Sequence, residues 1–169
     1  MRPPRLLEKN ALYHTVARAN LQEKIFNNDE DKAMVEEVVS LARKKFGFRQ
    51  KHFTVMENHI HLLIQPIGND YSLSAIMQWI LSVIAIRYNK KYHRKGHVWY
   101  DRFKSKIVRG SAYFNAVIKY ISNNPVKAKL AKDIFSYKFS GIYHLMNKKY
   151  HIVDEPDEAM LEIYPFLRD

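Results

Sequence analysis

The chain of 169 residues contains no cysteine and only five glycines. The lack of cysteine excludes a disulfide scaffold, a thiolate zinc site and a cysteine nucleophile. The longest stretch without Asp, Glu, Lys or Arg is residues 71–86, which is too short to cross a bilayer. Residues 1–5 lead into no apolar signal core, so we expect a cytoplasmic protein with no membrane partner.

Several motifs of common enzymes are also missing. The sequence has no G-x-x-x-x-G-K-[ST] and no G-x-G-x-x-G, which argues against nucleoside triphosphate hydrolysis. It has no G-x-S-x-G nucleophile elbow. Carboxylates do not cluster in residues 1–151, which disfavours a nuclease built on two metal ions and several acids.

Positive charge is abundant and unevenly distributed. The chain has 28 Lys and Arg against 17 Asp and Glu, but residues 152–169 hold six of the acids and only one base. We therefore divide the chain into a body, residues 1–151, with a net charge of +16, and an acidic tail, residues 152–169. A compact body of this charge favours a polyanionic partner such as nucleic acid, although a basic surface without such a partner is the alternative.

The hydrophobic pattern predicts the order β-α-β-β-α-β-α followed by the tail. This order indicates an α+β fold with a ferredoxin-like, split βαβ antiparallel sheet and helices on one face. We expect strands at 11–18, 48–56 and 59–65 and within 98–108. We expect helices at 29–46, at 72–92, from Ser111 to the Asn-Asn-Pro sequence of residues 123–125 that ends it, and at 158–163.

The third expected strand carries two histidines, His59 and His61, two positions apart. Side chains two apart on a strand point to the same face, so both imidazoles can reach one metal ion. Imidazole binds most divalent transition metals. The alternative is that both are half-exposed strand residues with no ligand.

The helix after Ser111 carries Tyr120 and Asn124, four positions apart and therefore on one face. Tyr113 lies seven positions before Tyr120 and shares that face. These side chains lie beside the apolar stripe, where they can reach a neighbouring strand. The alternatives are a packing role for the tyrosine and a helix stop at Asn124, because Pro125 follows.

A basic run with interleaved aromatic residues occupies residues 90–109. Cations bind phosphates and aromatic rings stack on unpaired bases, so the run favours binding of single strands or hairpin loops. The alternative is a solvated basic hairpin with Trp99 buried. The candidate contacts are Lys90, Lys91, Arg94, Lys95, Trp99, Arg102, Phe103, Lys104 and Lys106, extended by Lys127.

Four segments follow one another along the chain: 13–20 (YHTVARAN), 56–63 (MENHIHLL), 96–104 (GHVWYDRFK) and 119–128 (KYISNNPVKA). Together they resemble the single-tyrosine HUH transposases, in particular the REP-associated tyrosine transposases of bacteria. The resemblance departs from the family pattern at Glu57, where proline is common, and at Ala19, where glycine is common.

This resemblance implies metal-dependent cleavage and rejoining of single-stranded, hairpin-containing DNA through a 5′-phosphotyrosine. Tyr120 would be the nucleophile, and His59, His61 and Asn124 would bind Mg²⁺ or Mn²⁺. Arg18, in the first segment, would contact DNA. The resemblance further implies a nucleoid-associated protein that acts as a monomer or as a homodimer.

Three other functions remain open. The chain could be a ferredoxin-like nucleic-acid-binding protein that has lost catalysis, an HUH replication initiator or relaxase, or a structural metal-binding protein. The acidic tail matches no assigned motif. We expect it to fold over a basic groove of the body and to compete with DNA for that groove.

Overall fold

The structure is a computed structural model that describes residue 4 and residues 7–169. Most of the N-terminal segment considered above for a secretion signal therefore lies outside the described residues. Within those residues, no helix is long and apolar enough to cross a membrane. The strands are β1 (Tyr13–Arg18), β2 (Arg49–Val55), β3 (His59–Gln65) and β4 (Lys104–Ile107); the helices are α1 (Asp29–Phe46), α2 (Leu73–Lys91), α3 (Ser111–Lys127), α4 (Gly141–Met146) and α5 (Glu158–Ile163), with single 3-10 turns at Asn20–Gln22 and Pro165–Arg168.

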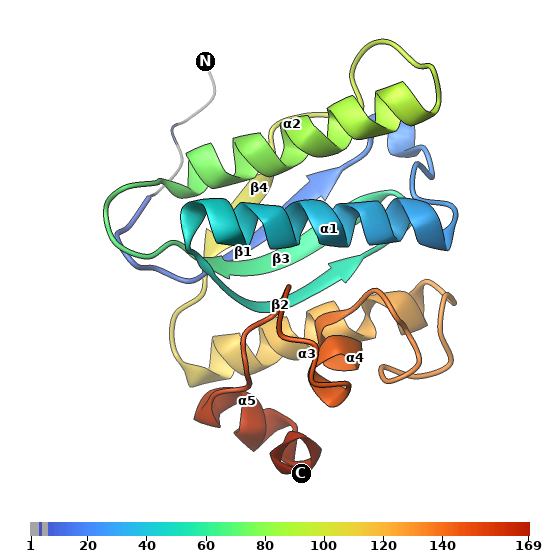
Figure 1. Cartoon of the computed structure of the whole chain (residues 1–169). Helices are drawn as coiled ribbons and strands as arrows, with labels where there is room; N and C mark the ends of the chain where they lie inside the picture. The colour runs from blue at the N-terminus through green and yellow to red at the C-terminus, as the bar shows by residue number, and fades with distance from the viewer. Residues whose placement is uncertain (1–3, 5–6) are drawn as a thin grey trace.

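The four strands form one sheet in the order β2-β3-β1-β4, and each neighbouring pair is antiparallel. β3 lies between β1 and β2, while β1 lies between β3 and β4, which is the split βαβ arrangement. The crossover helices α1 and α2 pack together and cover one face of the sheet (Figure 1). The predicted α+β, ferredoxin-like fold is confirmed.

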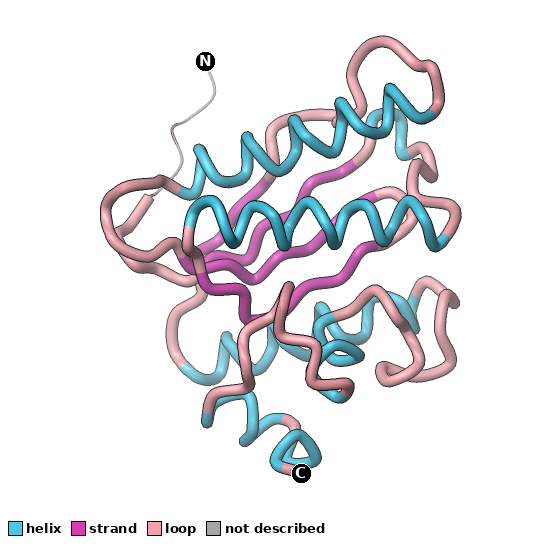
Figure 2. The backbone as a smooth tube through the Cα atoms, viewed as in Figure 1, coloured by secondary structure: helices cyan, strands magenta, loops and turns pink. Residues whose placement is uncertain are grey.

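The third helix, α3, lies on the opposite face, together with α4 and α5 (Figures 1 and 2). The expectation of helices on one face thus describes α1 and α2, and α3 adds a second layer. Its buried residues include Val117, Ile118 and Ile121, and it packs mainly on β2. This packing leaves the side of α3 that carries Tyr120 next to β1 and β3.

The boundaries of α1 and α2 follow their sequence signals. The Asn28 side chain accepts a hydrogen bond from the Asp31 N–H, and Gly47, with φ of 67°, ends α1 in the left-handed conformation. The Ser72 hydroxyl oxygen accepts from the Ala75 N–H at the start of α2.

The end of α3 differs from the prediction, because the helix continues through Pro125 to Lys127. Proline lacks an N–H to donate to the helix, yet Pro125 is buried against the rest of the molecule. The side-chain amides of Asn123 and Asn124 donate to the carbonyls of Lys119 and Tyr120, 2.8 and 3.0 Å away, within the last turns. Asn124 is therefore a helical residue and not the helix stop.

The fourth strand is shorter than expected. β4 spans only four residues, and Trp99 contributes an isolated bridge to Ala19 in place of a strand at 98–100. Val98 and Phe103 are buried, so the β-like pattern of this stretch reflects side chains that anchor a loop to the core.

The acidic tail packs along β2. Ile152 and Val153 belong to the buried core, and the Asp154 N–H donates to the Gln50 carbonyl over 2.8 Å. Lys51 forms an ion pair of 2.6 Å with Asp157. Because β2 and β4 are opposite edges of the sheet, the tail lies along the edge away from β4, and not over the basic residues of β4 as expected.

Candidate active site

The sheet face under α3 carries an unusual set of polar side chains. Residues paired across antiparallel strands point to the same face, and the register pairs Arg18 with His59, Val16 with His61, and His14 with Leu63. On the other side of β1, His14 pairs with Lys106 and Val16 with Lys104. The register therefore places three histidines and three cations on one face: His14, His59, His61, Arg18, Lys104 and Lys106.

The hydrogen bonds around His59 and His61 are compatible with one free ring nitrogen on each side chain. Nδ1 of His59 lies 2.6 Å from Asn58 Oδ1, an acceptor, so Nδ1 carries the proton and Nε2 keeps its lone pair. Nδ1 of His61 lies 2.9 Å from Nε2 of His14, and His61 Nε2 is buried without a hydrogen-bond partner. A proton on His61 Nδ1 leaves that buried Nε2 as a second lone pair, as metal ligation requires.

These histidines are held in the neutral form. Burial, followed by the charge of Lys106, lowers the pKa of His14 to about 4. Burial, followed by the charge of Arg18, lowers the pKa of His59 to about 4. For His61 the pKa lies well below 6.5, mainly because of burial. At neutral pH the site therefore offers imidazole lone pairs in a positively charged setting.

Tyr120 lies next to two of these rings, those of His14 and His61. Its ring centroid is 5.6 Å from that of His61 and 5.9 Å from that of His14, both in edge-on geometry. The side chain is nevertheless exposed, at 44% of its surface. The Lys127 ammonium lies 5.8 Å from the centre of the Tyr120 ring, in cation–π geometry.

An open groove runs beside Tyr120, between α3 and strands β1 and β4, with a volume of about 330 Å³. Its wall includes Tyr113, the second tyrosine on this side of α3. The groove is therefore open to an extended chain such as a polynucleotide, which could reach the phenol. Two exposed lysines, Lys104 and Lys106, line it.

Asn124 lies one turn after Tyr120 and is partly buried. Its amide nitrogen donates to the Tyr120 carbonyl, a bond that does not use Oδ1. Among the described residues, no three His, Asp or Glu side chains converge closely enough to form a metal site alone. A metal bound by His59 and His61 would therefore need a different type of ligand, such as an amide oxygen.

The predicted DNA contacts fall into separate regions. Lys91 pairs with Glu30 and Asp31 at the start of α1, and Arg94 pairs with Glu23 over 2.8 Å. Both cations thus bind the protein's own acids and lie away from Tyr120. Lys90 and Lys95 are exposed at the same end of α2, while Lys104, Lys106 and Lys127 border the groove and the tyrosine.

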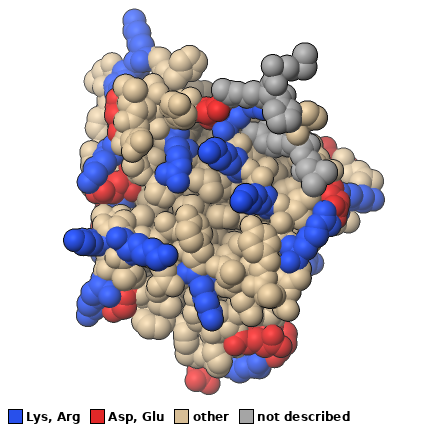
Figure 3. Space-filling model, turned by 180° about the vertical axis from the view of Figure 1, so that it is seen from behind, with Lys and Arg blue, Asp and Glu red and all other residues tan. Residues whose placement is uncertain are grey.

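The predicted stacking residues are more buried than expected. Phe103 is 7% exposed and belongs to the core. Trp99 is half-buried, its indole N–H donates to the Leu81 carbonyl over 2.8 Å, and its ring packs near Phe26. Lys and Arg side chains nevertheless spread over the face seen from behind, with fewer acids between them (Figure 3).

A buried hydrogen-bond network sits behind Tyr120. The Ser122 hydroxyl donates to the Ile118 carbonyl, 2.9 Å away, and accepts from the Tyr164 hydroxyl over 3.0 Å. His52 Nε2 lies 2.8 Å from the same oxygen, so it must be the second donor. The network joins α3 to β2 and to the tail, and it helps to fix the position of α3 on the sheet.

Sequence reasoning missed His14, His52, Ser122 and Tyr164 as parts of the site or its support. His14 had a signal, because His14, Val16 and Arg18 alternate along β1 and share one face. His52 and Tyr164 reach Ser122 from 70 and 42 residues away, so only the folded chain reveals that network.

We expect acid to destabilise the fold through His52. Burial lowers its pKa from 6.5 to about 3, so the folded state stays neutral while the unfolded state takes up a proton. The stabilisation is complete above pH 6.5 and is lost as the pH falls towards 3, by about 1.4 kcal/mol per pH unit.

Urea unfolding of wild type and His52→Gln at pH about 7.5 and about 5 tests this expectation. Glutamine keeps an N–H donor for Ser122 but cannot titrate, so the variant should lose about 2 kcal/mol less stability on acidification. Equal losses in both proteins would show that His52 does not contribute.

Residues 8–124 match the family model described as "Transposase IS200 like". No curated protein matches the chain. A solved structure of a REP-associated tyrosine transposase bound to a REP hairpin is similar, with a TM-score of 0.73, 19% identity, and coverage of 93% of this chain and 92% of that one. A structure assigned as a transposase from Deinococcus radiodurans R1 has a TM-score of 0.51 and 16% identity, over 73% of this chain and 97% of that one.

Proposed function

Because this chain belongs to the family of IS200-like transposases, we propose that it cleaves and rejoins single-stranded DNA through a covalent bond to Tyr120. The observation that carries this proposal is the placement of an exposed tyrosine within 5.6 Å of the ring of His61, measured between ring centroids. A packing tyrosine would bury its ring against the core, whereas this phenol borders an open groove.

The proposed substrate is a DNA hairpin with a flanking single strand. The similar transposase structure contains a REP hairpin, and the body of the present chain has a net charge of +16. Lys104 and Lys106 line the groove, and we propose that their ammonium groups bind phosphates of the strand. An edge strand and an open groove admit a single strand more readily than a duplex.

We assign His59, His61 and Asn124 as ligands of a divalent ion, Mg²⁺ or Mn²⁺. The unpartnered, buried Nε2 of His61 fits this assignment, because an orphaned lone pair in the interior is costly without a ligand. When bound, such an ion would polarise a non-bridging oxygen of the scissile phosphate and fix its orientation.

The chain's own residues then perform a phosphoryl transfer. The Tyr120 oxygen forms a bond to phosphorus, loses its proton to water, and the bond from phosphorus to the 3′ oxygen breaks. The departing oxygen takes up a proton and becomes a 3′-hydroxyl, while the 5′-phosphate remains on Tyr120. Attack by a 3′-hydroxyl reverses these steps, so the strand is rejoined without nucleoside triphosphate.

A denaturing gel tests the proposal. End-labelled single-stranded hairpins, incubated with the protein and Mn²⁺, should give a protein–DNA adduct that survives denaturation and is absent with chelator. Salt-dependent binding without any adduct across a hairpin library would instead support a nucleic-acid-binding protein without catalysis.

We further propose that one chain supplies the complete site, so that a homodimer is not required. His14, His61 and Tyr120 of the same chain are already in contact. Mixing Tyr120→Phe protein with His61→Ala protein should therefore restore no adduct formation. Recovery of a large part of the wild-type activity in the mixture would show that the tyrosine serves the histidines of a partner chain.

A further inference from the structure

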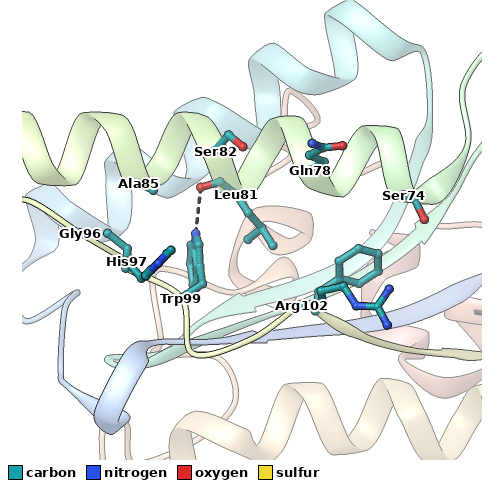
Figure 4. Close-up of a pocket in the computed structure, with 11 residues that line it drawn as sticks. Ser74, Gln78, Leu81, Ser82, Ala85, Gly96, His97, Trp99 and Arg102 are labelled. Carbon is teal, nitrogen blue, oxygen red and sulfur yellow. Dashed lines mark hydrogen bonds between the residues drawn. The ribbon is translucent and has the colours of Figure 1, made fainter. Parts of the chain in front are cut away.

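A second groove lies on the other side of the sheet, between α2 and the loop of residues 96–103. Its volume is about 510 Å³, larger than that of the groove beside Tyr120. Figure 4 shows α2 along one wall and the loop along the other, with the Trp99 indole bonded to the Leu81 carbonyl. This bond links the two walls of the groove.

The two walls of this groove differ in chemistry. Ser74, Gln78 and Ser82 are spaced four apart on α2, so they form one stripe of hydrogen-bonding side chains. Beneath them lie Leu81 and Trp99, which give an apolar surface. A flat ligand with polar edges fits this combination of an apolar surface and a polar stripe.

A short stretch of chain connects the lining of this groove to the lining of the groove beside Tyr120. Arg102 and Phe103 line the α2 groove, and Lys104 and Lys106 line the groove beside Tyr120. The chain from Arg102 to Lys106 is only about 13 Å long at the spacing of a strand. In the described part of the chain β4 is an edge strand paired with β1, so a DNA strand can pass around its outer side along this row of cations.

We propose that the α2 groove binds an unpaired base of the DNA strand that continues from the active site, with the adjoining phosphate on Arg102. This inference rests on the proposed function and adds a site that reads sequence away from the scissile phosphate. The Gln78 amide offers a donor and an acceptor side by side, which complements an adenine edge.

The charges of the groove favour a nucleotide over an apolar peptide or a cationic ligand. Arg102 is exposed at one end, and the described residues of the lining supply hydroxyls, an amide and the imidazole of His97 but no carboxylate. The exposed lysines that continue from Arg102 along β4 add further positive charge. A polyanion is the partner that satisfies this row of cations.

A double-mutant cycle between protein and DNA tests the proposal. The full-length Tyr120→Phe protein, which should bind without cleaving, is used as the parent, with a labelled hairpin whose single-stranded flanks come from selection on this protein. Each flank position is then made abasic, and the dissociation constant is measured by fluorescence anisotropy for the parent and for Gln78→Ala. Gln65→Ala, at the end of β3, is the matched control.

At one flank position the abasic change should raise the dissociation constant of the parent protein about fivefold or more. Gln78→Ala should raise the dissociation constant for intact DNA by a similar factor. Gln78→Ala should then bind the abasic DNA as tightly as the parent does. Gln65→Ala should leave the dissociation constants for intact and for abasic DNA unchanged. If the effect of Gln78→Ala simply adds to that of the abasic change at every flank position, Gln78 does not contact a base. That result would overturn the proposed base site but leave the proposed function standing. A parent that binds no single-stranded DNA would contradict both.

Discussion

Tyr120→Phe is expected to abolish the covalent protein–DNA adduct and to lower the cleavage rate at least about a thousandfold, because phenylalanine has no hydroxyl oxygen to attack phosphorus. The ring contacts with His14 and His61 are retained by phenylalanine, so folding and DNA affinity should stay close to wild type. The measurement is single-turnover cleavage of a labelled hairpin, with anisotropy as the check on binding.

Tyr113→Phe is the matched control for this prediction. Tyr113 lies on the same helix and borders the same groove, but the described ring contacts to the histidines come from Tyr120. The control should therefore keep most of the wild-type rate. An adduct that persists in Tyr120→Phe and disappears in Tyr113→Phe would assign the nucleophile to Tyr113.

Loss of His59 is expected to have the second largest effect. The side chain is only partly buried, so His59→Ala removes the proposed metal ligand with little change in packing. We expect Mn²⁺ affinity, measured by titration calorimetry, to fall about 10- to 100-fold, with cleavage falling at least as much at a fixed metal concentration. Raising the concentration of Mn²⁺ should restore part of the rate.

His151→Ala serves as the control for this loss, because His151 is exposed and contacts His144 on the tail side of the molecule. It should bind Mn²⁺ as the wild type does. If His59→Ala leaves both metal affinity and cleavage unchanged, the paired histidines are not the metal ligands, and the orphaned Nε2 of His61 needs another explanation.

The sequence predicts those parts of the site that depend on local periodicity. His59 and His61 share a face because strands alternate, and Tyr120 and Asn124 share a side because helices repeat near every fourth residue. The same local rules could not show that His14 touches His61, because that contact depends on the register between β1 and β3.

Long-range contacts also explain where the prediction of DNA contacts differs from the structure. Lys91 and Lys104 belong to one basic run, yet Lys91 pairs with Asp31, 60 residues earlier, whereas Lys104 faces the groove. Composition cannot distinguish a cation that pairs with an acid of the same chain from one that lines an open groove. The tail shows the same limit, since its acids pair with Arg43 and Lys51 near β2.

The central claim, a covalent bond between DNA and Tyr120, is tested most directly by peptide mass spectrometry of the trapped adduct. Cleavage after Arg109, Lys119 and Lys127 separates residues 110–119, which contain Tyr113, from residues 120–127, which contain Tyr120. We predict that the mass of a 5′-linked nucleotide is found on peptide 120–127, with the modified residue fragmenting as phosphotyrosine. A nucleotide on peptide 110–119, or on any peptide without Tyr120, would contradict the account.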